Sequence, residues 1–129
     1  MRERFFSVFG PQVIDARVLD LFAGTGAVGI EALSRGAAHA VFVDAHRSAA
    51  GLIRANLESL GVGPDRAKVL NRPAVRAIDD LARSPDPFDL IWADPPFPIW
   101  EEGAEALDAA VGSGLTSEDT VLCLECPAE

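Results

Sequence analysis

A glycine-rich turn and a downstream carboxylate are the residues of this sequence most suited to binding a nucleotide-like ligand. Gly24, Gly26 and Gly29 have the spacing G-x-G-x-x-G and directly follow an apolar run over residues 18–22. Such glycines let a ligand approach the backbone, and the helix that follows presents unpaired N–H groups. Asp44 lies twenty residues after Gly24, where a carboxylate that binds ribose hydroxyls belongs. We expect Asp44 at an exposed strand end, where it serves binding and not stability.

Asp20 helps to choose between two classes of ligand. The glycine spacing alone fits NAD and S-adenosylmethionine about equally. Asp20 is an acid inside an otherwise apolar strand, four residues before the first glycine. A buried carboxylate is costly unless a partner pairs with it, and the amino group of a methionine portion would be such a partner. The alternative is that Asp20 binds the N–H groups of the glycine loop itself.

A second candidate site is the run Asp94-Pro95-Pro96-Phe97. Two successive prolines remove two N–H donors and hold the backbone extended, so their carbonyl groups stay free to accept hydrogen bonds. A carboxylate, free carbonyls and an aromatic ring suit a planar group with an exocyclic amine, such as a nucleobase. The alternative is a turn that simply ends a strand.

The hydrophobic pattern places both candidate sites on one predicted sheet. We expect strands over residues 18–22, 40–44, 67–70, 88–94 and 120–126. Helices are expected over residues 2–13, from the glycine turn to residue 36, and over 46–60, 74–83 and 101–111. In the third of these, Leu52, Ile53, Leu57 and Leu60 are expected to face inward. Alternating strands and helices predict an α/β, doubly wound, mostly parallel sheet with the order 3-2-1-4-5. The ligand crevice then lies at the carboxyl ends of the first and fourth strands.

Length and charge limit the possible functions. The 129 residues are enough for a single domain over residues 1–129 with a real core, and the net charge is −9. Residues 85–129 hold eleven acidic and no basic side chains, whereas residues 37–84 hold seven basic and five acidic ones. This distribution counts against an overall RNA-binding surface, and a basic patch could come only from Arg2, Arg4 and the arginines between residues 47 and 83. With no membrane-spanning run and no signal peptide, we expect a cytoplasmic monomer without a membrane partner.

The two cysteines do not indicate a metal site. Cys123 and Cys126 lie on the last predicted strand. Positions three apart on a strand point to opposite faces, so a shared metal ion is not expected. We predict two buried thiols and no bound metal.

Several stretches resemble the amino-methylating class I methyltransferases, which use S-adenosylmethionine, and more narrowly the bacterial RsmD family. These are residues 2–6, 20–26, 29–37 and 94–97. The resemblance implies a Rossmann-like methyltransferase domain that methylates guanine N2 in 16S ribosomal RNA, with ribosomal RNA or a small-subunit assembly intermediate as partner. Members usually carry a basic segment before the first helix and a closing hairpin after the fifth strand. We therefore expect a domain trimmed at both ends.

The resemblance also assigns two sets of site residues. The residues assigned to cofactor binding are Asp20, Phe22, Ala23, Gly24, Thr25, Gly26, Asp44, Ala45, His46 and Ala74. The catalytic set is Asp94, Pro95, Pro96 and Phe97. Asp94 and the Pro95 carbonyl would accept the amine hydrogens, and Phe97 would stack on the base. Pro73 departs from the family pattern, because a polar residue that holds the adenine amino group often stands there.

Three alternatives stay open at this point. The first is a methyltransferase of the same fold that acts on a small molecule or a protein amide, which an acidic surface would favour. The second is an NAD-binding oxidoreductase, which the glycines permit. The third is a scaffold that keeps the cofactor site without catalysis.

Overall fold

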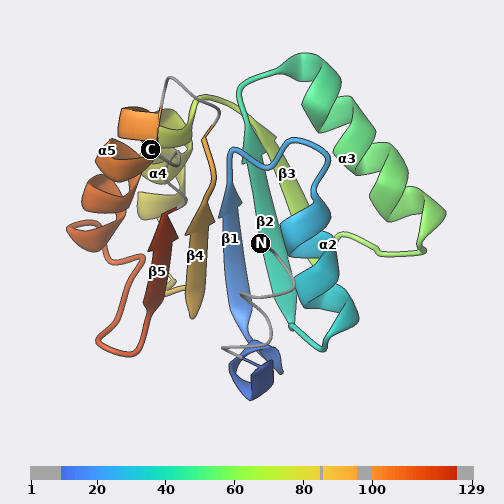
Figure 1. Cartoon of the computed structure of the whole chain (residues 1–129), viewed down its shortest axis with the longest axis horizontal. Helices are drawn as coiled ribbons and strands as arrows, with labels where there is room; N and C mark the ends of the chain where they lie inside the picture. The colour runs from blue at the N-terminus through green and yellow to red at the C-terminus, as the bar shows by residue number, and fades with distance from the viewer. Residues whose placement is uncertain (1–9, 85, 96–99, 125–129) are drawn as a thin grey trace, which may run out of the picture.

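The computed structural model describes residues 10–84, 86–95 and 100–124. A parallel sheet with the order β3-β2-β1-β4-β5 forms its centre (Figure 1). The strands are β1 (Arg17–Leu21), β2 (His39–Asp44), β3 (Ala67–Asn71), β4 (Leu90–Ala93) and β5 (Val121–Leu124). The helices are a short 3-10 helix, η1 (Gly10–Val13), then α2 (Ala27–Ser34), α3 (Arg47–Ser59), α4 (Ala74–Ala82) and α5 (Trp100–Val111). The predicted fold class and strand order are confirmed.

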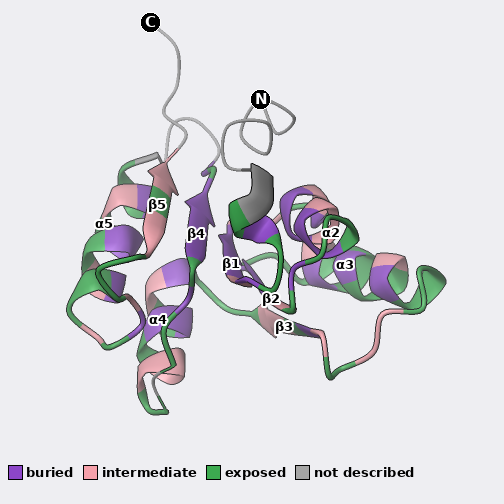
Figure 2. Cartoon of the chain, turned by 90° about the horizontal axis from the view of Figure 1, so that it is seen from below, coloured by how far each residue is buried: buried purple, intermediate pink, exposed green. Residues whose placement is uncertain are grey.

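Two hydrophobic layers hold the helices on opposite faces of the sheet. One layer packs α2 and α3 against the sheet around Phe42 and Trp92. The other packs α4 and α5 around Leu21 and Ile91. Side chains alternate between the faces of a strand, so the central strands supply both layers and are apolar nearly throughout. Figure 2 shows this burial along β1, β2 and β4.

The observed elements differ from the expected ones in three places. The expected helix over residues 2–13 lies mostly outside the described residues, and its described end is the 3-10 helix η1. The fourth strand is shorter than the expected 88–94: it begins at Leu90, after Phe88 has donated its N–H to the Leu115 carbonyl, and it ends at Ala93. Leu52 and Leu60, expected to face inward, are 46% and 60% exposed. The buried stripe of α3 instead consists of Ala50, Ile53 and Leu57.

Gly29 lets α2 approach β2 closely, and we expect its replacement to destabilise the fold. A Cβ atom at Gly29 would lie 2.7 Å from Cζ of the fully buried Phe42 ring. Gly29→Ala should lower the free energy of unfolding by about 1–3 kcal/mol, since a packed core tolerates overpacking poorly. Denaturant unfolding measures this. Gly51→Ala on α3 is the control, because nothing lies within 4 Å of its Cβ position; an equal loss in both variants would contradict the packing argument.

Neither a membrane span nor a metal cluster is found in the described part of the chain. No helix there has both the length and the apolar character needed to cross a bilayer. The described residues include no group of three or more His, Cys, Asp or Glu side chains that could hold a metal ion. Cys123 is half-buried on β5, and Cys126 lies outside the described residues.

Candidate functional site

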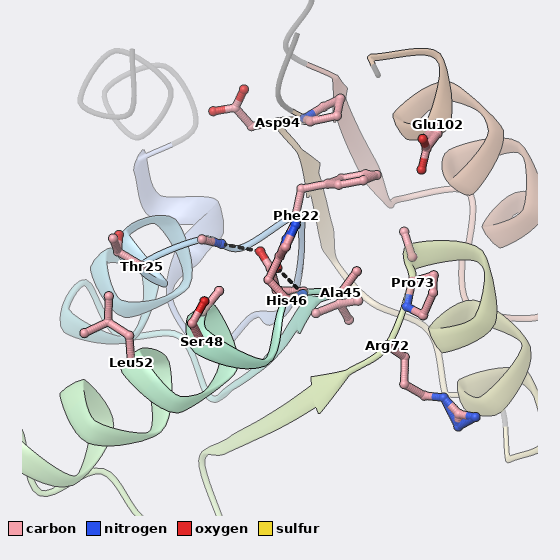
Figure 3. Close-up of a pocket in the computed structure, with 16 residues that line it drawn as sticks. Phe22, Thr25, Ala45, His46, Ser48, Leu52, Arg72, Pro73, Asp94 and Glu102 are labelled. Atoms are coloured by element: carbon pink, nitrogen blue, oxygen red, sulfur yellow. Dashed lines mark hydrogen bonds and ion pairs between the residues drawn. The ribbon is translucent and has the colours of Figure 1, made fainter. Parts of the chain in front are cut away.

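A cavity of about 670 Å³ opens at the carboxyl ends of the strands. It is lined by segments that follow β1, β2, β3 and β4, and by one face of α3 and the first turn of α5 (Figure 3). In a doubly wound sheet of this order, ligands bind where the winding changes direction, between the first and fourth strands. The volume is in the range of small-molecule sites. The cavity is therefore the candidate site.

The glycine loop after β1 forms one wall of this cavity. Phe22, Gly24 and Gly26 have φ angles of 58°, 60° and 83°, in the left-handed region. A left-handed conformation is uncommon for a phenylalanine, and such strained residues concentrate at binding sites. The loop is tied to β2 because the Ala23 N–H donates to the Val43 carbonyl at 2.9 Å. Its turn carries the Phe22 ring into the middle of the cavity (Figure 3).

Asp44 organises the loop from the end of β2. One carboxylate oxygen accepts from the Gly24 N–H at 2.8 Å, and the other accepts from the His46 N–H at 2.9 Å. The His46 Nδ1 atom lies 3.2 Å from that second oxygen. Asp44 is only 8% exposed, so the expectation of an exposed strand end was wrong. Each carboxylate oxygen has two lone pairs, so Asp44 keeps acceptor capacity toward the cavity.

Asp20 lies beneath α2 and does not line the cavity. It is 1% exposed and stands in register with Phe42 and Trp92 on the neighbouring strands. One of its oxygens accepts from the Gly29 N–H, in the first turn of α2, at 3.0 Å. This hydrogen bond matches the alternative given above, in which Asp20 holds the loop and helix. Direct contact with a ligand amino group stays a prediction.

Asp94 and Pro95 follow β4 on the other side of the cavity. Asp94 is exposed, whereas Pro95 is buried against α5. A Cβ atom at Gly103 would lie 2.9 Å from Cγ of Pro95 and 2.8 Å from Cδ1 of Leu124. The absence of a side chain at Gly103 therefore lets α5 rest directly on Pro95. Pro96 and Phe97, the rest of the predicted motif, lie outside the described residues.

The chain matches a known protein family over its whole length. The family profile described as "Conserved hypothetical protein 95" matches residues 1–129. The chain belongs to this family. It is the RsmD family that the motifs resemble.

Two curated relatives and one solved structure illustrate the family. The chain is 34% identical over 131 residues to "Ribosomal RNA small subunit methyltransferase D" of Escherichia coli (strain K12), covering 100% of this chain and 62% of that protein. It is 32% identical over 97 residues to the protein of the same name from Haemophilus influenzae, covering 75% and 50%. A solved structure of a conserved hypothetical protein from Streptococcus pyogenes matches with a TM-score of 0.82 at 36% identity, covering 100% and 81%. The chain thus spans less than two thirds of these two curated relatives.

Most residues that the RsmD resemblance assigns lie around the one cavity. Those that line it are Phe22, Gly24, Thr25, Asp44, Ala45, His46, Ala74, Asp94 and Pro95. Ala23 and Gly26 belong to the loop but do not line the cavity; their N–H groups donate to the carbonyls of Val43 and Ala23. Asp20 does not line it either and accepts from the Gly29 N–H of α2. The loop and the strand ends therefore share one site, as the topology predicts.

Other lining residues were not predicted as site residues. They are Val43, Ser48, Ala49, Leu52, Arg72, Pro73 and Glu102. Ser48, Ala49 and Leu52 have helical spacing and form a second stripe beside the buried one on α3, which is the signal that could have found them. Arg72 turns away from the cavity and pairs with Asp80 at 2.8 Å (Figure 3). Glu102 was missed because it belongs to a group of acidic residues on α5, a pattern typical of a helix face in contact with solvent.

Proposed function

We propose that this chain is the catalytic core of an S-adenosylmethionine-dependent methyltransferase that methylates the N2 amine of guanine in 16S ribosomal RNA. The observation that carries the proposal is that Asp44 with the glycine loop and Asp94 with Pro95 line the same cavity. The carboxylate that would bind the ribose and the groups that would accept the amine hydrogens thereby face one cavity. The names of the two curated relatives support ribosomal RNA as the substrate.

The lining of the cavity fits S-adenosylmethionine. Asp44 has lone pairs left for ribose hydroxyls, and the Gly24 backbone faces open space on the side where a side chain would stand. An apolar wall suits the adenine ring; it consists of Val43, Ala45, Ala49, Leu52, Pro73 and Ala74. When bound, the cofactor supplies a methyl group on a positively charged sulfur, which is a good leaving group.

The residues after β4 would prepare the target amine. The Asp94 carboxylate and the Pro95 carbonyl oxygen accept the two amine hydrogens, which directs the nitrogen lone pair toward the methyl group. The negative charge of Asp94 stabilises the positive charge that develops on the nitrogen. Because the leaving group is already good, positioning of this kind supplies most of the catalysis. Phe97 stays assigned to stacking on the base by its place in the motif.

Asp20 disfavours the NAD-binding alternative. In dinucleotide-binding proteins, the pyrophosphate sits at the N-terminus of the helix after the glycine turn. Here the buried Asp20 carboxylate already accepts a hydrogen bond from Gly29 in that first turn. Its negative charge offsets the positive end of the helix dipole and would repel a pyrophosphate. A ligand without phosphate, carrying a cationic methionine portion, meets no such repulsion.

Calorimetry with two ligands tests the proposed function. We expect S-adenosylhomocysteine, the demethylated product, to bind at least tenfold more tightly than NAD, because only NAD brings a pyrophosphate toward Asp20. Both titrations use the same protein preparation at the same salt concentration. Tighter binding of NAD would restore the oxidoreductase alternative. Failure to bind S-adenosylhomocysteine would remove the methyltransferase proposal.

The distribution of basic residues suggests where RNA would approach. Arg66 is occupied by the carbonyls of Leu33 and Ala37, and its role is structural. Arg47 and Arg76 are exposed in the first turns of α3 and α4, the helices that start at the cavity edge of the sheet. We infer that the phosphate backbone of ribosomal RNA, free or in a small-subunit assembly intermediate, crosses this side. The acidic side chains of α5 would repel an RNA backbone, so a small molecule or a protein amide stays the alternative substrate.

A further inference from the structure

Glu102 gives the cavity a carboxylate to which the mechanism assigns no role. It lies in the first turn of α5 and lines the cavity. Figure 3 shows its carboxylate turned toward the ring of Phe22. The neighbouring Glu101 has the same charge, and both side chains are exposed, but Glu101 does not line the cavity.

The packing of α5 holds the backbone of its first turn, which includes Glu102, against the segment after β4. The next residue, Gly103, is buried and has no room for a Cβ atom between Pro95 and Leu124. The first turn of α5 is therefore held against the segment that carries Asp94. The position of the Glu102 backbone at the cavity therefore depends on the contact between α5 and Pro95.

Helix electrostatics alone do not account for Glu102. Acidic residues in a first turn are favoured by the helix dipole, which explains Glu101 and Glu102 equally. Among the residues that the structure describes, no hydrogen bond or ion pair to Glu102 is found. Residues 85–129 contain no basic side chain that could neutralise it. Its exposed carboxylate keeps acceptor capacity at the cavity.

We propose that Glu102 reads the identity of the substrate base by accepting the hydrogen of the ring N–H next to the target amine. This inference rests on the proposed function. Guanine carries the N1–H donor beside its N2 amine, whereas adenine and cytosine carry a bare ring nitrogen, an acceptor, beside theirs. A site whose groups are the Asp94 carboxylate, the Pro95 carbonyl and the Glu102 carboxylate contains acceptors alone. It binds the adjacent N1–H and N2–H donors of guanine and repels the bare ring nitrogen beside the amine of adenine or cytosine.

The first test compares Glu102→Gln with the matched control Glu101→Gln. The substrate is small-subunit particles isolated from bacteria that lack their own RsmD-family enzyme. Glu102→Gln should lower kcat/KM by about tenfold to a hundredfold, the loss expected for one charge-assisted hydrogen bond. Glu101→Gln should stay within about twofold of wild type, and both variants should keep their affinity for S-adenosylhomocysteine and their Tm. Equal kcat/KM in the two variants, or a matching loss of cofactor affinity in Glu102→Gln, would overturn the assignment.

The second test measures base recognition directly. Guanosine 5′-monophosphate and adenosine 5′-monophosphate are compared as inhibitors of the same reaction. The wild-type protein should be inhibited by a lower concentration of the guanine nucleotide than of the adenine nucleotide. In Glu102→Gln, the two inhibitory concentrations should lie closer together, because an amide can both accept and donate a hydrogen bond. An unchanged ratio would overturn the role of Glu102 in specificity. Wild-type protein that methylates no particle would instead refute the proposed function, and the inference with it.

Discussion

Asp94→Ala is expected to slow methyl transfer by about a hundredfold to a thousandfold while leaving the binding of S-adenosylmethionine within a few-fold of wild type. The proposed partner of Asp94 is the substrate amine, and the loop contacts of Asp44 do not involve Asp94. Removing one preorganised group that stabilises developing charge lowers kcat by about a hundredfold to a thousandfold. Asp94 is exposed at the end of β4, so the fold should tolerate the change.

The conservative variant separates the charge of Asp94 from its shape. Asp94→Asn keeps an amide oxygen that can accept one amine hydrogen, so it should retain more activity than Asp94→Ala. The measurements are single-turnover methylation of small-subunit particles and calorimetry with S-adenosylhomocysteine. Full methylation by Asp94→Ala would remove the residue from the mechanism and leave the motif as a turn.

The strand order and the meeting of the two motifs could be predicted because the topology leaves few choices. Parallel strands joined by right-handed crossovers place all strand ends on one edge of the sheet. The segment after β1 and the segment after β4 must then be neighbours, whatever the details of the side chains. For the same reason, nine of the predicted site residues line a single cavity.

The sequence left two kinds of partner open for Asp20, a ligand amino group or the N–H groups of the glycine loop, and indicated only ribose hydroxyls for Asp44. Asp20 and Asp44 both need partners once buried, and both bind backbone N–H groups, of Gly29 for one and of Gly24 and His46 for the other. Every residue except proline has such a group, so residue types do not indicate which one is used. The left-handed turn of the loop decides which backbone N–H groups point toward the carboxylates.

The helix faces of the site were missed for a related reason. A difference of one position rotates a helical side chain by about 100 degrees, so the boundary of a buried stripe is hard to place. Leu52, next to the buried Ile53, turns out to line the cavity instead of the core. Glu102 is separated from Glu101 in the same way, and only the packing of Gly103 on Pro95 shows which of the two acids faces the site.

Asp44→Ala is expected to weaken S-adenosylhomocysteine binding about a hundredfold or more and also to destabilise the free protein. The buried carboxylate holds two backbone N–H groups, which lose their acceptor in the variant. Because the cavity admits water, the free energy of unfolding should fall by about 1–3 kcal/mol and not by the full cost of two buried unpaired donors. Denaturant unfolding without ligand measures this part. His46→Ala is the control, since it removes the ring contact at 3.2 Å and keeps the backbone donor.

A ligand without ribose hydroxyls decides whether Asp44 also contacts the cofactor. In wild-type protein, the 2′,3′-dideoxy analogue of S-adenosylhomocysteine should bind more weakly than the parent compound, because the Asp44 carboxylate loses its hydroxyl partners. In Asp44→Ala, the two compounds should bind with equal affinity, since the loop is disturbed equally for both. His46→Ala should preserve the wild-type difference. If Asp44→Ala still distinguishes the two compounds as wild type does, Asp44 acts on binding only through the Gly24 and His46 backbone, and the ribose is held by other groups.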